Sequence, residues 1–291
     1  MRYLLFTVLL SFFSQFSMAQ YYYKDLVINK QLTAEMALLK EQKIRLIKVN
    51  SFDREDEPSI GFFCEKKINK NFSKIETTSK SYATPGSILT SYFNSLGQLE
   101  ESVDSTEISV GYSKYQYNDK GNLISIESGS RSSDDDYSVD ATETHRYFYN
   151  SQNQLQKMVK LKNNKDSVVI NFVLDEKGNV IEEQNTVTKQ NYYYYYDNKN
   201  RLTDIVYFNN SLRKLLPVIM FEYNGVNQVT QMITAEEGSL FYYTWKYTYE
   251  NGLKLREKCY YNKKGDPLIR EGGGGYAGPR NLQGIIEYEY K

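Results

Sequence analysis

A short pattern recurs along this chain and limits its fold more than any other feature. The pattern reads aromatic or apolar, any residue, aromatic, Asn or Asp, two polar residues, Gly or Asn, any residue, Leu or Val. Its clearest copy runs from Tyr115 to Leu123. Internal repeats of this kind predict a repeat architecture. Full copies also span 147–155, 172–180, 194–202 and 221–229. In a weaker copy only the last part, residues 93–99, follows the pattern, and distorted copies span 247–255 and 259–268.

The chemistry of the pattern predicts one β-hairpin per copy. Its two aromatic residues point to one face of a strand, because strand side chains alternate. Asn or Asp at the next place can bond its own backbone and open a turn. The place three residues later favours positive φ, as a type I turn followed by a bulge requires. We expect tight hairpin turns at Gly97, Gly121, Asn153, Gly178, Asn200, Asn227 and Gly265.

Two copies depart from the pattern. Leu253 stands where the turn residue belongs, and Gly252 comes one place early, so this turn must be of another type. Pro267 interrupts the last copy, which indicates a bulge or an edge strand there. Return turns are expected at 163–166, 209–211 and 236–238.

The fold class that follows is all-β: an antiparallel sheet of consecutive β-hairpin repeats, curled or solenoid-like. The 28 Tyr residues suit such strands, since tyrosine combines a large apolar ring with a polar tip. Alternation predicts that one face is buried. The residues expected on it are Tyr115, Tyr117, Tyr147, Tyr149, Tyr194, Tyr196, Leu123, Leu155 and Leu202.

Residues 115–123 and 194–202 resemble the signature of the YD-repeat, or RHS-repeat, family, and the resemblance extends from about Ser87 to Lys291. It implies a curled β-sheet that encloses a cavity, as in large bacterial surface and toxin-delivery proteins. The whole chain also resembles small secreted YD-repeat proteins of Bacteroidetes. Family copies usually carry Arg after the turn Gly, whereas this chain mostly has Asn or Gln there, with Arg201 as the match. A toxin domain is not apparent.

The N-terminus has the layout of a secretory signal peptide. Arg2 precedes an apolar run from Tyr3 to Phe13, and small residues surround an expected cleavage site between Ala19 and Gln20. The alternative is a membrane anchor, but the run is shorter than the roughly 20 residues that a spanning helix needs. We therefore expect residues 1–19 to be removed and the protein to be exported, to the periplasm, the outer surface or the medium.

Residues 20–86 read differently from the repeats in residues 87–291. Thr33 can cap a short helix over 34–42, and a strand is expected over 43–50, followed by a charged loop over 51–58. Because the open edges of a repeat sheet need protection, we interpret 20–86 as a small α/β N-terminal cap. An independent functional domain is the alternative.

Composition excludes several function classes. Lys+Arg and Asp+Glu both number 36, so a balanced chain has no long-range attraction for nucleic acid. No later segment is apolar enough for a membrane-spanning helix, so an integral membrane protein is not expected. Cys64 and Cys259 are compatible with a disulfide or with two separate buried thiols.

The sequence predicts no catalytic residue, no metal site and no cofactor. His145, with Glu143 and Asp140 nearby, could be a general base or a ligand, but a lone His beside an aromatic strand is more often structural. Residues 134–136 are three Asp, which we interpret as a solvated loop, since the Gly and terminal Glu of a calcium loop are missing. Residues 272–275 are four Gly without the Lys-Ser/Thr of a phosphate-binding loop.

The face opposite the buried tyrosines is the best candidate for binding. In the run Tyr192 to Tyr196, Tyr193 and Tyr195 point away from that face, and other copies place aromatic residues similarly. Exposed rings would suit sugar stacking or a partner surface, unless both faces of the sheet are covered. The candidate binding residues are Tyr92, Phe148, Tyr193, Tyr195 and Tyr260.

Four functions follow, in order of preference. The first is a non-catalytic exported protein that binds a glycan or a protein through its sheet surface. The second is a structural β-shell or scaffold of the cell envelope without a specific ligand. An outer-membrane barrel comes third, although residues 157–162 carry charge on both alternating faces. A hydrolase that uses only carboxylates comes last.

Overall fold

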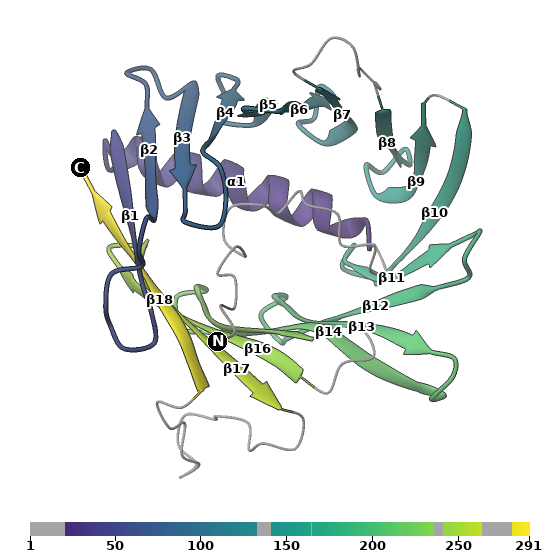
Figure 1. Ribbon diagram of the computed structural model, residues 1–291. Helices are drawn as coiled ribbons and strands as arrows, with labels where there is room; N and C mark the ends of the chain where they lie inside the picture. Colours follow the sequence, from purple (N-terminus) through teal and green to yellow (C-terminus); the bar gives the residue numbers. More distant parts are fainter. Residues whose placement is uncertain (1–20, 133–140, 164, 236–240, 264–280) are drawn as a thin grey trace. The chain divides into compact units, whose positions relative to one another are not determined.

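The computed structural model describes residues 21–132, 141–163, 165–235, 241–263 and 281–291 (Figure 1). The predicted signal peptide, Gly265, the Asp and Gly runs and the return turn at 236–238 lie outside these ranges. The chain divides into two compact units. The first comprises Met1–Lys48, Ile60–Lys189 and Tyr290–Lys291, and the second comprises Val49–Ser59 and Gln190–Glu289.

Among the described residues there are one α-helix and 18 strands. They are α1 (Tyr23–Glu41), β1 (Leu46–Phe52), β2 (Phe63–Ile68), β3 (Lys74–Lys80), β4 (Ser87–Phe93), β5 (Leu99–Thr106), β6 (Ser109–Tyr117), β7 (Leu123–Ser132), β8 (Ala141–Tyr149), β9 (Leu155–Lys162), β10 (Asp166–Leu174), β11 (Val180–Asn185), β12 (Asn191–Tyr196), β13 (Leu202–Asn209), β14 (Lys214–Tyr223), β15 (Val229–Ala235), β16 (Phe241–Glu250), β17 (Leu253–Lys263) and β18 (Leu282–Tyr290).

Neighbouring strands in the sequence are neighbours in the sheet. In the first unit, β2 to β11 form an antiparallel series, and β12 to β18 form another in the second unit. This confirms the all-β class and the consecutive hairpins.

The first strand of the sheet has hydrogen-bonded partners on both sides, β2 and β18. The backbones of Leu46 and Lys291 exchange two hydrogen bonds of 2.9 Å, and the Ile68 N–H donates to the Arg45 carbonyl at 2.9 Å. An open sheet, whether curled or solenoid-like, would leave β1 with a free edge, so that part of the expectation is wrong. Local hairpin signals carry no information about pairing between the two ends of the chain.

The hairpin turns have the predicted geometry. In the copy at 115–123, the Asn118 carboxamide oxygen accepts the N–H groups of Lys120 and Asn122, at 3.0 Å each. The Gly121 N–H donates to the Asn118 carbonyl at 2.8 Å. Because this turn needs a left-handed residue, the Gly/Asn restriction follows. Positive φ is found at Gly97 (77°), Gly121 (78°), Asn153 (65°), Gly178 (84°), Asn200 (64°) and Asn227 (67°).

A bulge accompanies each of these turns, as expected. Gln116 pairs with Ser125, but the next residue, Tyr117, pairs with Leu123, so the register shifts by one residue. The distorted copy at 247–255 forms a shorter connection instead. Asn251 and Gly252 both have positive φ, 50° and 84°, and join Glu250 directly to its partner Leu253. Two consecutive positive-φ residues make a type I′ turn, which confirms that this turn differs in type.

In four copies, the tyrosine that precedes the turn links adjacent repeats. Its hydroxyl donates to the backbone carbonyl of the Leu or Val that starts the return strand of the preceding copy. This contact explains why tyrosine recurs there, since phenylalanine would lack the donor. The four links are Tyr117 to Leu99 (2.7 Å), Tyr149 to Leu123 (2.9 Å), Tyr223 to Leu202 (2.7 Å) and Tyr249 to Val229 (2.8 Å).

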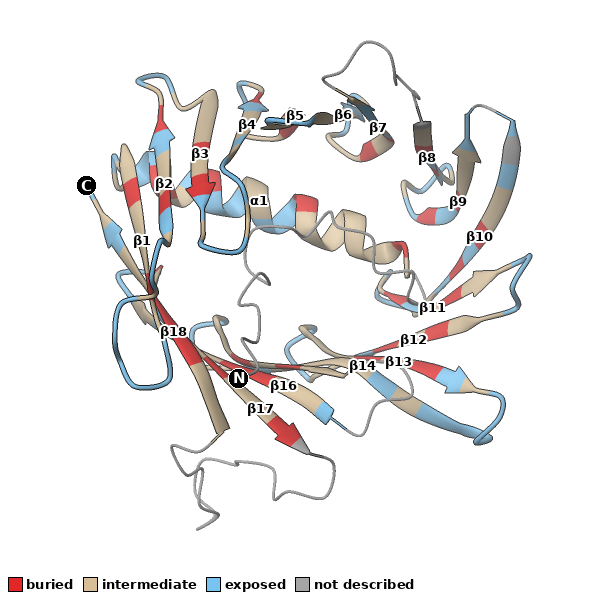
Figure 2. Cartoon of the chain, in the orientation of Figure 1, coloured by how far each residue is buried: buried red, intermediate tan, exposed pale blue. Residues whose placement is uncertain are grey.

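Burial follows the predicted alternation (Figure 2). Tyr147, Tyr194, Leu123 and Leu155 are buried, while Tyr195 on the opposite face is exposed. The remaining residues expected on the buried face are half-buried, namely Tyr115, Tyr117, Tyr149, Tyr196 and Leu202. The predicted register therefore holds.

The N-terminal helix is longer than expected. It begins at Tyr23, well before Thr33, whose hydroxyl donates to the Asn29 carbonyl inside the helix at 3.0 Å. Thr33 is therefore not a cap. The true cap comes from the sheet, where the Glu183 carboxylate accepts the N–H groups of Tyr22 and Tyr23 at 2.9 Å. A cap about 160 residues away leaves no local signal. The strand expected over 43–50 is β1, three residues later.

Candidate functional site

The structure does not gather the five candidate aromatic residues into one site. Tyr92 on β4 and Phe148 on β8 are both exposed, but three strands separate them. At about 4.8 Å per strand, that places them roughly 19 Å apart. Each pairs with a lysine on the neighbouring strand, Lys74 and Lys157 respectively. The Lys157 ammonium lies 5.2 Å from the centre of the Phe148 ring.

Tyr193 and Tyr195 lie together on β12, whereas half-buried Tyr260 lies on β17 of the same unit. Across the sheet, Tyr193 pairs with Val206 and Val206 with Pro217. These partners share the outward face, because directly paired residues point the same way.

Two apolar residues that the sequence reasoning missed extend this surface. Phe208 and Leu215 pair with each other on β13 and β14 and are 37% and 45% exposed; Tyr195 is 47% exposed. Their signal was the alternation within β13, where Tyr207 is buried and Phe208 is not. We call this surface the outer patch; it consists of Tyr193, Tyr195, Val206, Phe208, Leu215 and Pro217.

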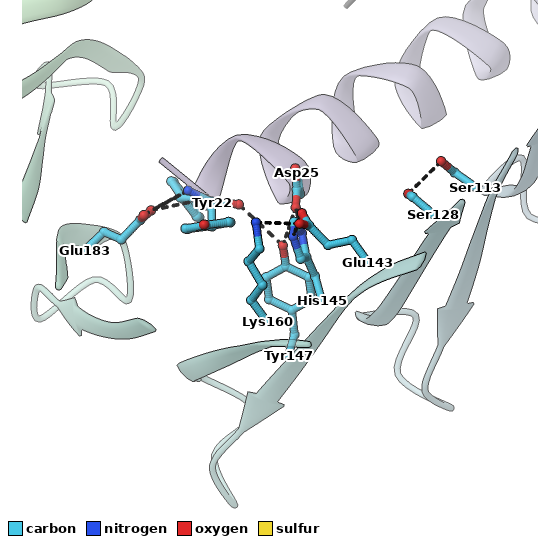
Figure 3. A network of polar contacts seen from close by, with 10 residues as sticks. Tyr22, Asp25, Ser113, Ser128, Glu143, His145, Tyr147, Lys160 and Glu183 are labelled. Atoms are coloured by element: carbon cyan, nitrogen blue, oxygen red, sulfur yellow. Dashed lines mark hydrogen bonds and ion pairs between the residues drawn. The ribbon is translucent and has the colours of Figure 1, made fainter. Parts of the chain in front are cut away.

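A second cluster, made of polar side chains, lies in the first unit between α1 and the strands beneath it (Figure 3). His145 on β8 stands at its centre. Its Nδ1 lies 2.6 Å from Oδ2 of Asp25, in the first turn of α1, and its Nε2 lies 2.9 Å from Oε1 of Glu143. The Tyr147 hydroxyl also donates to Oδ2 of Asp25, at 2.7 Å. Sequence reasoning found Glu143 beside His145 but not Asp25, which lies 120 residues away.

The charges in this cluster reinforce one another. Burial alone would lower the pKa of His145, but its hydrogen bonds to Asp25 and Glu143 outweigh that effect and raise it to about 9. Burial raises the pKa of Glu143, yet His145 and Lys160 together bring it down to about 2. The Lys160 ammonium lies 2.5 Å from Glu143 Oε2. At neutral pH the cluster therefore holds an imidazolium between two carboxylates.

The same region holds the beginning of α1. The Tyr22 ring meets the His145 ring edge-on, with the ring centres 5.2 Å apart. Glu183, only 1% exposed, holds the first backbone N–H groups, as described above. Further along, the Asn29 carboxamide donates to the Tyr117 hydroxyl at 2.7 Å, and that hydroxyl donates to Leu99. These contacts hold α1 against β5, β6, β8 and β11.

This geometry favours a structural role for His145. The two carboxylates of a glycoside hydrolase lie on either side of the substrate, but here the imidazole ring fills the space between Asp25 and Glu143. Asp140, the other acid named with His145, lies outside the described residues.

One further buried acid, Glu257, lies in the second unit. Its Oε1 accepts from the Lys254 ammonium at 2.8 Å and from the Tyr288 hydroxyl at 2.6 Å. The Lys254 ammonium also lies 4.6 Å from the centre of the Tyr247 ring. Glu257 thus has a cation and a hydroxyl to balance its charge in a buried position.

Cys64 and Cys259 are both buried free thiols, as the simpler of the two interpretations had it. Burial raises the pKa of Cys64, and burial together with Glu257 raises that of Cys259 to about 12. Thiols of this kind are poor nucleophiles.

Within the described part of the chain, no cluster of His, Cys, Asp and Glu could hold a metal ion. Over the same residues, no helix is both long and apolar enough to cross a membrane.

No protein-family model and no curated protein matches the sequence. Three solved structures show a distant likeness. A porin-like protein from Bacteroides uniformis is 14% identical, with 85% of this chain and 98% of that protein covered and a TM-score of 0.39. The TcdB2–TccC3–Cdc42 structure is 12% identical over 79% of this chain, with a TM-score of 0.28. The Photorhabdus luminescens Tc holotoxin pore gives the same three values.

This chain spans only 17% and 16% of the two toxin chains. At TM-scores this low, the likenesses carry no argument about fold or function.

Proposed function

We propose that this chain is an exported, non-catalytic binding protein that presents the outer patch of β12–β14 to a glycan or a protein. The observation that supports it is the contiguity of the patch: three adjacent strands expose aromatic and aliphatic side chains on one face. Single exposed apolar residues are common, but contiguous apolar surface usually marks an interaction site.

The polar clusters support the non-catalytic part of the proposal. Asp25, Glu143 and Glu183 each bind groups of the protein itself, and these contacts hold α1 on the sheet. In the second unit, Glu257 binds Lys254 and Tyr288. A carboxylate-only hydrolase would instead need two acids facing a shared space for the substrate.

We also infer that the hairpins are degenerate YD repeats. The turn chemistry supports this, because the Asn or Asp and the positive-φ Gly or Asn recur at one register. In three copies, the residue at the place where family copies carry Arg contacts the next copy. Gln98, Asn122 and Arg201 each donate a side-chain hydrogen bond to the turn of the next copy.

The test is a glycan array and a pull-down with the mature protein, followed by variants. The double variant Tyr193→Ser/Tyr195→Ser should weaken binding at least tenfold, as loss of two central aromatic contacts typically does. Tyr92→Ser is the matched control, because Tyr92 is similarly exposed but lies on β4 of the first unit and is not a member of the outer patch. Equal binding by the folded double variant and the wild type would refute the outer patch as the binding surface.

A structural β-shell is the second candidate. The Tyr-to-carbonyl links favour it, since they join successive hairpins through the backbone and need no ligand. This candidate predicts no ligand in either screen, together with high resistance of the described strands to proteolysis. A ligand that depends on Tyr193 and Tyr195 would exclude it.

A further inference from the structure

α1 is held on the sheet in two different ways along its length. Its C-terminal half makes a small apolar cluster, in which Met36 packs with Phe93 and Leu99. Its N-terminal half is held by polar groups instead: Glu183 on the first N–H groups, His145 on Asp25, and Tyr117 on Asn29. Removing one partner of a buried ion pair leaves the other charge uncompensated, so the attachment of this half depends on the protonation state of the groups that hold it.

The central contact works in only one protonation state. Both ring nitrogens of His145 face carboxylate oxygens, at 2.6 and 2.9 Å. A neutral imidazole has one N–H and one bare lone pair, so it can serve only one of these oxygens and must repel the other. Loss of a single proton therefore breaks the link to either Asp25 or Glu143.

Other groups around His145 do not replace that proton. Lys160 neutralises Glu143 from the far side, and the Tyr147 hydroxyl donates to Asp25. The pKa of Tyr22 is raised by burial and nearby carboxylates to about 12, and that of Tyr115 by burial and Asp25 to about 12. The pKa of Tyr147 lies well above its usual value for the same reasons, with Glu183 adding to the effect. These hydroxyls stay neutral while His145 titrates.

The connection after α1 is short. The helix ends at Glu41, and the N–H groups of Gln42, Lys43 and Ile44 donate to carbonyls of its last turn. Lys43, with a φ of 58°, therefore belongs to the cap that ends the helix. Arg45 then fixes the chain to the sheet: its guanidinium lies 3.5 Å from the centre of the Phe72 ring and donates to the carbonyls of Asn69 and Lys70. If α1 moves as a unit, it therefore turns about the junction of Ile44 and Arg45.

We propose that α1 is a releasable cover, closed by the Asp25–His145–Glu143 contact, which opens as a unit about the junction of Ile44 and Arg45 and uncovers the tyrosine-lined face of the first unit. The uncovered face includes Tyr115, Tyr117 and Tyr147, whose rings or hydroxyls α1 and the residue before it now contact. This device is independent of the outer patch, which belongs to the second unit.

The pH dependence has a defined sign. Because the pKa of His145 is raised from 6.5 to about 9, the contact is at full strength below pH 6.5 and is lost as the pH rises through 9. At tenfold for each pH unit between these values, the equilibrium for opening should rise by up to roughly 300-fold between pH 6 and pH 10.

Hydrogen exchange on the mature protein tests the proposal. After correction for intrinsic exchange rates, the amides of 26–38 should lose protection by up to roughly 300-fold at pH 10, while those of β4 to β8 keep theirs. At pH 6, His145→Gln should produce the same selective loss, and its α1 should no longer respond to pH. Glu76→Gln is the matched control, because it breaks an exposed ion pair with Lys74 on β3.

Two results would overturn the proposal. If α1 and the strands lose protection together, the helix is part of the cooperative core and is no cover. If α1 keeps its protection at pH 10 in the wild-type protein, His145 does not control it. The wild-type pH series decides the matter even if His145→Gln fails to fold.

Discussion

Replacing the tyrosine before a turn with phenylalanine should show what the hydroxyl links contribute. Tyr149→Phe removes a 2.9 Å hydrogen bond to the Leu123 carbonyl, and Tyr223→Phe removes one of 2.7 Å to Leu202. Both substitutions keep the ring and therefore the apolar burial. A hydrogen bond of this kind contributes about 1 kcal/mol, because the carbonyl loses its partner and water only partly replaces it.

Urea unfolding gives the magnitude directly. Each single variant should lower the free energy of unfolding by about 1 kcal/mol, or the melting temperature by roughly 2–4 °C. Tyr149 and Tyr223 lie in different units, so their effects should add, to about 2 kcal/mol in the double variant. If the units unfold in separate transitions, each variant should shift only the transition of its own unit.

Tyr195→Phe is the matched control, since it removes an exposed hydroxyl from the outward face of a repeat strand. Its stability should stay within a few tenths of a kcal/mol of the wild type. If Tyr149→Phe and Tyr223→Phe behave like this control, the hydroxyl links are incidental. Tyrosine would then recur for its ring alone.

Three other changes test the turns and the attachment of α1. A Cβ added at Gly178 or at Gly225 meets nothing within 4 Å, but of the two only Gly178 has positive φ (84°). Gly178→Ala should therefore lower the free energy of unfolding in urea by about 1 kcal/mol. Gly225→Ala should leave it unchanged or raise it by about 0.5 kcal/mol. Glu183→Ala leaves buried N–H groups at the start of α1 without their acceptor and should cost about 2–3 kcal/mol, with the loss of hydrogen-exchange protection greatest in α1. The pKa of Glu143 is lowered to about 2, so its contribution to stability is present above pH 4.5 and is lost as the pH falls towards 2. Between pH 5 and pH 2.5, the free energy of unfolding of the wild type should fall by up to about 2 kcal/mol, and that of Glu143→Gln by less. Equal losses in the two proteins would contradict this role.

The turns could be predicted from the sequence because their causes are local. The Asn118 side chain bonds groups two and four residues away, and Gly121 supplies the left-handed conformation three residues on. Alternation then fixed which face of the run from Tyr192 to Tyr196 is buried. Each of these inferences needs only the few residues of one hairpin.

The position of α1 could not be predicted for the opposite reason. Its start depends on Glu183, and its first turn on His145, more than 100 residues away in the sequence. Local signals therefore placed the start of the helix after Thr33, as its cap. The outer patch was found only in part, because Phe208 and Leu215 become neighbours of Tyr193 through strand register, which no single repeat reveals.

The residue after the turn shows how such repeats can change their sequence and keep their structure. Gln98 donates to the carbonyl of Gly121, and Asn122 to the side chain of Asn153. Arg201 donates to the carbonyl of Asn224. These three side chains differ in length and charge, yet each supplies a donor that reaches the next turn. Selection on that contact requires a donor of sufficient reach and not a particular residue, so copies can diverge beyond a sequence pattern while the hairpins stay joined.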